Sequence, residues 1–138
     1  MEEKLKILFV CVENARRSQI AAGFAETFGQ GKLEVYSAGS RPSSVIDPMV
    51  IDVMKEKGID LSAKQPKSLN DLPPIEMDYL ITMGCEETCP AVITKKIIEW
   101  EIPDPKGKSI DTFREVRDLI EDKVKGFIKE IKNVTRER

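Results

Sequence analysis

The stretch "ILFVCVENARRSQ", residues 7–19, decides the fold, because an apolar run passes directly into a cysteine, a polar loop and two adjacent arginines. Residues 4–10 are typical of a buried strand, with apolar side chains and no glycine or proline. Residues 18–28 have helical periodicity, since apolar side chains recur on one face. The sequence therefore predicts a strand, a short loop and a helix, with Cys11 directly after the strand.

The rest of the chain continues this alternation of strands and helices. The sequence predicts a strand over 33–39, a helix over 47–59, a strand over 78–83, a strand within 97–104 and an amphipathic helix over 109–131. Asp47 suits the N-cap of the second helix, Pro48 its first turn and Gly58 its C-terminal cap. This order predicts an α/β fold, in which residues 1–138 form one domain with a parallel sheet and helices on both faces.

Composition narrows the class of protein. The 138 residues include 41% hydrophobic and 33% charged residues, which is typical of one globular domain. A net charge of −2, without a basic block, argues against nucleic-acid binding. No apolar run approaches the roughly 20 residues of a membrane span, and the start of the chain does not resemble a signal peptide. We therefore expect a cytoplasmic protein that acts as a monomer, without a membrane or nucleic-acid partner.

The cysteine and histidine content restricts the chemistry. The chain has three cysteines, Cys11, Cys85 and Cys89, which favours reactive or redox roles over a structural disulfide framework. It has no histidine, which excludes Cys-His and Ser-His-Asp mechanisms and mixed Cys/His zinc sites. Activation of a cysteine must then come from arginines, backbone N–H groups and a helix terminus. We expect no metal and no cofactor.

The loop after Cys11 is typical of an anion site. A loop between a strand and a helix can turn its N–H groups inward, and the helix adds the positive end of its dipole. Arg17 can hold two oxygens of a tetrahedral oxyanion, and the same field stabilises a Cys11 thiolate, to which Ser18 can donate a hydrogen bond. Asn14 suits a position with positive φ. The predicted substrate-binding residues are Val12, Glu13, Asn14, Ala15, Arg16, Arg17 and Ser18. The alternative is a buried structural cysteine beside solvated arginines.

Three groups follow predicted strands and should converge on one edge of the sheet: Cys11, the segment Gly84–Cys89, and Asp104. Asp104 stands in "IPDPKG", where two prolines stiffen the loop. A leaving oxygen needs a proton, and in a chain without histidine a carboxylic acid is the natural donor. The alternative is an aspartate in an ordinary turn.

Cys85 and Cys89 form the motif "GCEETCP". A zinc site is a poor interpretation, because these two cysteines and the distant Cys11 do not complete four ligands. Residues four apart on a helical turn lie roughly 6 Å apart at Cα, within reach of a disulfide after modest rearrangement. The alternative is two partly buried free thiols.

The segments "CVENARRSQIA", "YSAG", "TMGCEETCP" and "WEIPDP" together resemble the thioredoxin-coupled arsenate reductase family, which has the low-molecular-weight protein tyrosine phosphatase fold. The similarity extends over nearly the whole chain in the expected order. It implies a four-stranded parallel sheet, Cys11 as nucleophile, Arg17 as oxyanion ligand and Asp104 as general acid. Two departures are Glu13, where the family usually has glycine, and Arg16, where some relatives have another cysteine.

The resemblance implies reduction of arsenate to arsenite. Cys11 attacks arsenate, Cys85 then attacks the Cys11 sulfur, and Cys89 resolves the product to a Cys85–Cys89 disulfide. The short spacing of this pair leaves open the order in which Cys85 and Cys89 attack. It also leaves open the reductant, which is thioredoxin, a glutaredoxin-like protein or a low-molecular-weight thiol.

Two other functions use the same loop. A low-molecular-weight protein tyrosine phosphatase would form a cysteinyl-phosphate intermediate on Cys11, and weak phosphatase activity is expected even from a reductase. "RRSQ" resembles the reductases, whereas phosphatases typically have "RSP" at this position. Phosphatases also usually carry tyrosines after the D-P pair, whereas "DPKG" stands there in this chain. The third function is an oxyanion-binding or redox-sensing module without turnover, for which Glu13 is the best support.

Overall fold

A parallel sheet lies at the centre of this computed structural model, which describes residues 4–84 and 93–136. Within these residues the sheet has four strands in the order β2-β1-β3-β4. The strands are β1 (Leu5–Cys11), β2 (Leu33–Gly39), β3 (Met77–Thr82) and β4 (Thr94–Glu99). β1 pairs with β2 on one side and with β3 on the other, so it lies inside the sheet. Its side chains on both faces belong to buried hydrophobic clusters. This position explains its continuous apolar run, in which Ile7, Leu8, Phe9 and Val10 are fully buried.

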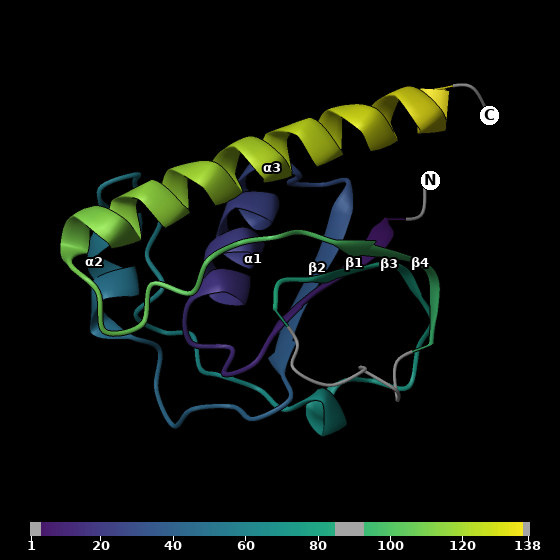
Figure 1. Cartoon of the computed structure of the whole chain (residues 1–138). Coiled ribbons are helices and arrows are strands. Elements are labelled where there is room, and N and C mark those ends of the chain that lie inside the picture. The colour runs from purple at the N-terminus through teal and green to yellow at the C-terminus, as the bar shows by residue number, and fades with distance from the viewer. Residues whose placement is uncertain (1–3, 85–92, 137–138) are drawn as a thin grey trace.

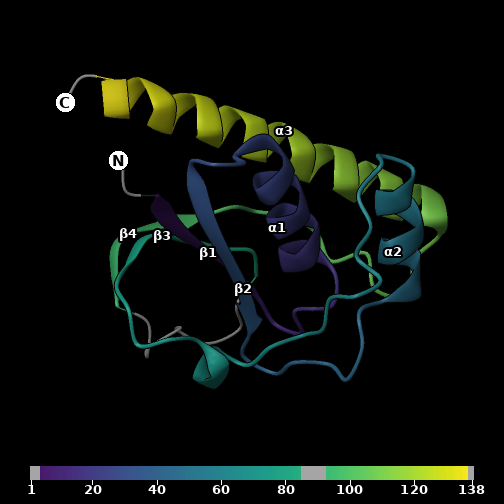
Figure 2. The same ribbon diagram turned by 180° about the vertical axis from the view of Figure 1, so that it is seen from behind.

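The three α-helices pack together on one face of the sheet, as Figure 1 and Figure 2 show. They are α1 (Arg17–Phe28), α2 (Pro48–Lys55) and α3 (Ile110–Arg136). Ile7 and Phe9 of β1 contribute to the core beneath them. On the opposite face Leu8 and Val10 pack near the short 3-10 helix η1 (Leu69–Asp71). Helical structure therefore lies on both faces, as the sequence predicts, although η1 is a single turn.

The predicted elements are present; three of them differ from the prediction by several residues, and three others by one residue. The helix expected over 47–59 ends at Lys55, although Asp47 caps it as predicted by accepting a hydrogen bond from the Met49 N–H at 3.0 Å. The long C-terminal helix continues beyond residue 131 to Arg136. The strand expected within 97–104 lies instead at Thr94–Glu99. This strand is the edge of the sheet and is largely exposed, so its lysines interrupt the apolar pattern that sequence analysis depends on.

The parallel register brings three predicted groups to one edge of the sheet. The Met83 N–H donates to the Val10 carbonyl at 2.8 Å, and the Trp100 N–H donates to the Thr82 carbonyl at 2.9 Å. The ends of β1, β3 and β4 are thereby aligned, so Cys11, Gly84 and the segment that leads to Asp104 meet there. Cys85 and Cys89 lie outside the described residues.

Of the helices in residues 4–84 and 93–136, none combines the length and the apolar character that crossing a membrane requires.

Two neighbouring residues of α3 test this packing. Ile120 is fully buried in the core, whereas the adjacent Leu119 is 38% exposed. Ile120→Ala should lower the free energy of unfolding by about 2–5 kcal/mol, because it leaves a cavity between the helix and the sheet. Leu119→Ala should change it by no more than about 0.5 kcal/mol. Urea denaturation of both variants measures the difference, and equal effects would contradict the orientation of α3.

Candidate active site

The loop between β1 and α1 is held from its outer side by backbone hydrogen bonds. The carbonyls of Val12, Glu13 and Ala15 accept from the N–H groups of Arg41, Ser43 and Asp47 at 2.8, 3.0 and 3.2 Å. In a trans peptide the carbonyl and the following N–H point in opposite directions. The N–H groups of residues 13, 14 and 16 therefore point to the inner side of the loop. This is the arrangement of a backbone anion nest.

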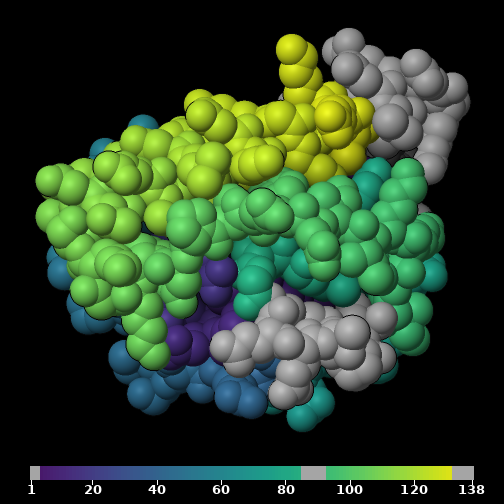
Figure 3. All heavy atoms as spheres, viewed as in Figure 1, coloured from purple at the N-terminus to yellow at the C-terminus, as the bar shows by residue number. Residues whose placement is uncertain are grey.

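Two backbone features let the loop close tightly. Asn14 has φ 52°, and among the described residues it is the only non-glycine residue with positive φ, as its position in the motif predicts. Gly39 at the end of β2 lies under the loop, where an added Cβ atom would be 2.6 Å from the Val12 carbonyl oxygen. Figure 3 shows the purple N-terminal part of the chain at the floor of a hollow, between blue and green segments that come later in the sequence.

The Cys11 thiol lies at the start of this loop and is 3% exposed. Its Sγ is 2.9 Å from the Ser18 hydroxyl oxygen. The Asn14 side-chain amide donates to the same hydroxyl oxygen at 2.6 Å, which leaves the hydroxyl hydrogen free to point at Sγ. The side-chain oxygen of Asn14, Oδ1, in turn accepts from the Lys67 N–H at 2.8 Å and from the Gln19 side chain at 3.1 Å. The predicted contact between Ser18 and Cys11 is therefore present and oriented by a buried network.

Arg17 begins α1, and its side chain is buried beside the segment that follows β4. One terminal nitrogen, Nη1, donates to the Ile102 carbonyl at 3.0 Å, and Nη2 lies 3.7 Å from the Asp104 carboxylate. The residue is only 7% exposed. Its guanidinium group is thus held between the anion loop and the Asp104 loop.

The neighbouring Arg16 differs from Arg17 in its partners, because three carboxylates surround its side chain. Its Nε donates to Asp104 at 2.9 Å, Nη1 to Asp47 at 3.4 Å, and Nη2 to Glu13. Burial acts to lower the pKa of Arg16, but these carboxylates outweigh burial and raise it above its ordinary value. The part of Arg16 that faces the inner side of the loop is its peptide N–H.

Glu13 brings a negative charge close to the anion loop, and three side chains offset it. Ser43 donates to one carboxylate oxygen at 2.7 Å, while Lys106 at 3.0 Å and Arg16 contact the other. The Ser43 hydrogen bond, followed by Lys106 and Arg16, lowers the pKa of Glu13 to about 2, although burial acts in the opposite direction. Glu13 is therefore an ionised and paired group rather than an isolated charge beside the site.

Asp104 completes the set of side chains that the sequence places at this site. It is 88 residues from Arg16 in the sequence, yet it accepts from the Arg16 Nε at 2.9 Å and from the Lys106 N–H at 3.1 Å. The structure thus brings Asp104 to Arg16 and Arg17, at the helical end of the loop that begins at Cys11. Of the groups that hold these residues, sequence analysis missed three side chains, one backbone N–H group and one carbonyl: the side chains of Gln19, Ser43 and Lys106, the Lys67 N–H and the Ile102 carbonyl. Only Lys106 carried a signal, as a cation within the "DPKG" motif.

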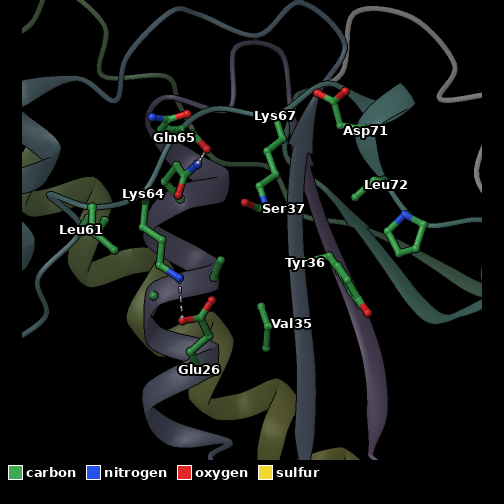
Figure 4. Close-up of a pocket in the computed structure, with 15 residues that line it drawn as sticks. Glu26, Val35, Tyr36, Ser37, Leu61, Lys64, Gln65, Lys67, Asp71 and Leu72 are labelled. Carbon is green, nitrogen blue, oxygen red and sulfur yellow. Dashed lines mark hydrogen bonds and ion pairs between the residues drawn. The ribbon is translucent and has the colours of Figure 1, made fainter.

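A separate cavity of about 370 Å³ lies between α1, β2 and the segment around residues 61–73 (Figure 4). It adjoins the site through Gln19 and Lys67, and the Gln19 side chain also lies 3.4 Å from the Gln65 carbonyl. No described cluster of three or more acidic or cysteine side chains is arranged to hold a metal ion.

Comparisons with known proteins agree with this geometry. The sequence profile of the family described as low molecular weight phosphotyrosine protein phosphatase matches residues 6–137. The chain is 38% identical over 129 residues to the glutaredoxin arsenate reductase of Synechocystis, covering 91% of this chain and 98% of that protein. A solved arsenate reductase in the phosphate binding state superposes with a TM-score of 0.84 at 35% identity, covering 92% of this chain and 98% of that one. The thioredoxin-dependent arsenate reductase of Corynebacterium glutamicum superposes with a TM-score of 0.79 at 33% identity, covering 96% of this chain and 64% of that one.

Because the pKa of Glu13 is low, the free energy of unfolding depends on pH. Because the pKa is lowered from 4.5 to about 2 in the folded state, Glu13 stabilises the fold above about pH 4.5. This contribution is lost as the pH falls towards about 2. The free energy of unfolding of the wild type should therefore decrease more over this interval than that of Glu13→Gln, as measured by denaturant titration at each pH.

Ser43→Ala should raise the pKa of Glu13, because the Ser43 hydrogen bond is the largest cause of its low value. The loss of unfolding free energy on acidification should then be smaller than in the wild type. Ser44→Ala, at the adjacent exposed position, is the matched control and should leave the acid dependence unchanged. Parallel pH profiles for the wild type and Glu13→Gln would contradict the pairing of Glu13.

Proposed function

Because the chain belongs to the low molecular weight phosphotyrosine protein phosphatase family, and its similar proteins include arsenate reductases at 33–38% identity, we propose that it reduces arsenate to arsenite. The observation that carries the proposal is a buried thiol at the start of an anion nest, in contact with a serine hydroxyl. Arg17 directly follows the same loop, and Asp104, from a distant part of the sequence, lies 3.7 Å from its guanidinium group. Arsenate and phosphate share the tetrahedral shape and charge that such a nest binds.

In the first step, the Cys11 thiolate attacks the arsenic atom of bound arsenate. The Ser18 hydroxyl, oriented by Asn14, donates to the thiolate and lowers the cost of its charge in a buried position. The inward N–H groups and Arg17 bind the other oxygens and stabilise their negative charge. Asp104 supplies a proton to the departing oxygen, which leaves as water, and a sulfur–arsenic bond forms on Cys11.

In the second step, a thiolate of the Cys85–Cys89 pair attacks the Cys11 sulfur. A disulfide forms, the sulfur–arsenic bond breaks, and its electron pair stays on arsenic, which leaves as arsenite. We propose Cys85 as the attacking thiol and Cys89 as the thiol that then releases Cys11. The support is the position of Gly84, whose backbone adjoins the Arg17 guanidinium. Cys85 is the next residue, and consecutive Cα atoms are about 3.8 Å apart.

The cycle closes when an external dithiol reduces the Cys85–Cys89 disulfide. We propose thioredoxin or a similar thiol donor, since one similar protein is a glutaredoxin arsenate reductase and another is thioredoxin-dependent. We further propose that residues 1–138 act as a single domain and as a monomer, because all proposed catalytic groups come from one chain. A cycle that needs free thiols suits the reducing cytoplasm.

A phosphatase is the second candidate function, and the description of the matching family favours it. Cys11, Arg17 and Asp104 would perform the same first step on a phosphate ester, with a cysteinyl-phosphate as the intermediate. Hydrolysis of that intermediate needs neither Cys85 nor Cys89. The two functions therefore differ in what happens to the thiols.

Thiol counting distinguishes the two functions. Reduced protein incubated with arsenate in the absence of oxygen should lose two free thiols, release arsenite and contain a Cys85–Cys89 disulfide in peptide mass spectrometry. Cys89→Ser should stop at a Cys11–Cys85 disulfide if Cys85 attacks first. If all thiols remain free while an aryl phosphate is hydrolysed efficiently and Cys11→Ser abolishes that hydrolysis, the protein is a phosphatase.

Asp104→Asn tests the proton donor. The asparagine retains an oxygen that accepts from Arg16 but has no acidic proton, so the rate of the first chemical step should fall by about 10²–10⁴-fold. Rapid-quench measurement of a single turnover reports this rate. The matched control is Asp111→Asn on α3, where the aspartate side chain is 81% exposed and pairs with Arg114. An unchanged rate in Asp104→Asn would assign the proton to another group.

A further inference from the structure

Gly84 lies against the guanidinium group of Arg17. It follows β3 with φ 83°, a backbone conformation that favours glycine. A Cβ atom added at this position would overlap Nη1 of Arg17 and would lie 3.1 Å from Cζ and 3.2 Å from Nη2. These are the three nearest atoms to such a Cβ, and all belong to Arg17. The contact is therefore between the backbone of residue 84 and one functional side chain.

The Arg17 guanidinium is confined between two segments of chain. Its Nη1 donates to the Ile102 carbonyl at 3.0 Å, and the same atom faces Gly84. The Ile102 carbonyl belongs to the segment after β4, and Gly84 belongs to the segment after β3. The two neighbours of the guanidinium group therefore follow adjacent strands of the sheet. A side chain at position 84 would occupy the space of the guanidinium and break its hydrogen bond to Ile102.

We propose that Gly84 is a positioning residue for anion binding, because the absence of a side chain there allows Arg17 to face the anion nest. The inference rests on the proposed role of Arg17 as an oxyanion ligand. The atom that a Cβ would meet is the end of a flexible side chain, which can rotate away. A side chain at residue 84 therefore displaces Arg17 and leaves the fold intact.

Gly31 provides a matched control for the backbone. It has the same φ of 83°, but an added Cβ atom there has no neighbour within 4 Å. Gly31 lies in the turn before β2, at the opposite end of that strand from Gly39 and the loop. Gly31→Ala and Gly84→Ala therefore impose the same backbone strain, and only the second adds a contact with Arg17.

The probe is inorganic phosphate, and isothermal titration calorimetry of the full chain measures its dissociation constant. Gly84→Ala should weaken phosphate binding by about tenfold or more, the effect of losing one charge-assisted hydrogen bond. Gly31→Ala should bind phosphate as the wild type does, and urea denaturation should show that both variants remain cooperatively folded. Gly84→Asn repeats the test with less backbone strain, since asparagine tolerates positive φ.

The effect must also depend on Arg17. In an Arg17→Ala background there is no guanidinium to displace, so adding Gly84→Ala should change phosphate affinity by less than about twofold. Equal losses in both backgrounds, or wild-type affinity in Gly84→Ala, would overturn the inference and leave the proposed function standing. A wild-type protein that binds no phosphate would overturn the anion site itself, and with it the proposed function.

Discussion

The burial of two adjacent arginine side chains is the constraint on which the site depends. Arg16 and Arg17 are 6% and 7% exposed, and a buried charge is stable only when it is paired and hydrogen-bonded. Their partners come from distant parts of the chain: Asp47 at the start of α2, and Ile102 and Asp104 after β4. Satisfying the two guanidinium groups thereby draws the loop after β1, the start of α2 and the Asp104 loop into one arrangement.

The two arginines have different partners in this arrangement. Three carboxylates, from Glu13, Asp47 and Asp104, surround Arg16, so its side chain connects segments and neutralises charge. Among residues 4–84 and 93–136, Arg17 has one carbonyl partner and one carboxylate at 3.7 Å. These use fewer than the five N–H donors of a guanidinium group, which is consistent with its proposed role as an oxyanion ligand. The negative charge that Glu13 adds to the loop is offset by Arg16 and Lys106, so it does not oppose an anion in the nest.

Sequence analysis succeeded where the signal is local and failed where it depends on a neighbour. The central strand β1 was predicted because it is buried on both faces and so is apolar throughout. The edge strand β4 was placed too late in the chain because its exposed lysines have no apolar pattern. Among the candidate site residues, Cys11, Arg17 and Ser18 were predicted together from one loop, and Asp104 was predicted from its motif. Ser43 and Lys67 were missed because their partners, Glu13 and Asn14, lie 30 and 53 residues away in the sequence.

The sequence by itself determined the alternation of strands and helices, the position of a thiol after the first strand, and the loop chemistry around it. These features depend on side-chain periodicity and on residue types within a few positions of one another, which can be seen in a linear chain. Only the tertiary structure decided that Arg16 pairs with three carboxylates while Arg17 donates to the Ile102 carbonyl. It also decided that Gly39 lies against the loop and Gly84 against Arg17. These outcomes depend on contacts between segments that the parallel register brings together, such as the hydrogen bonds of 2.9 Å from Arg16 to Asp104 and 3.0 Å from Arg17 to the Ile102 carbonyl. Such distances follow from packing, for which residue spacing carries no local signal.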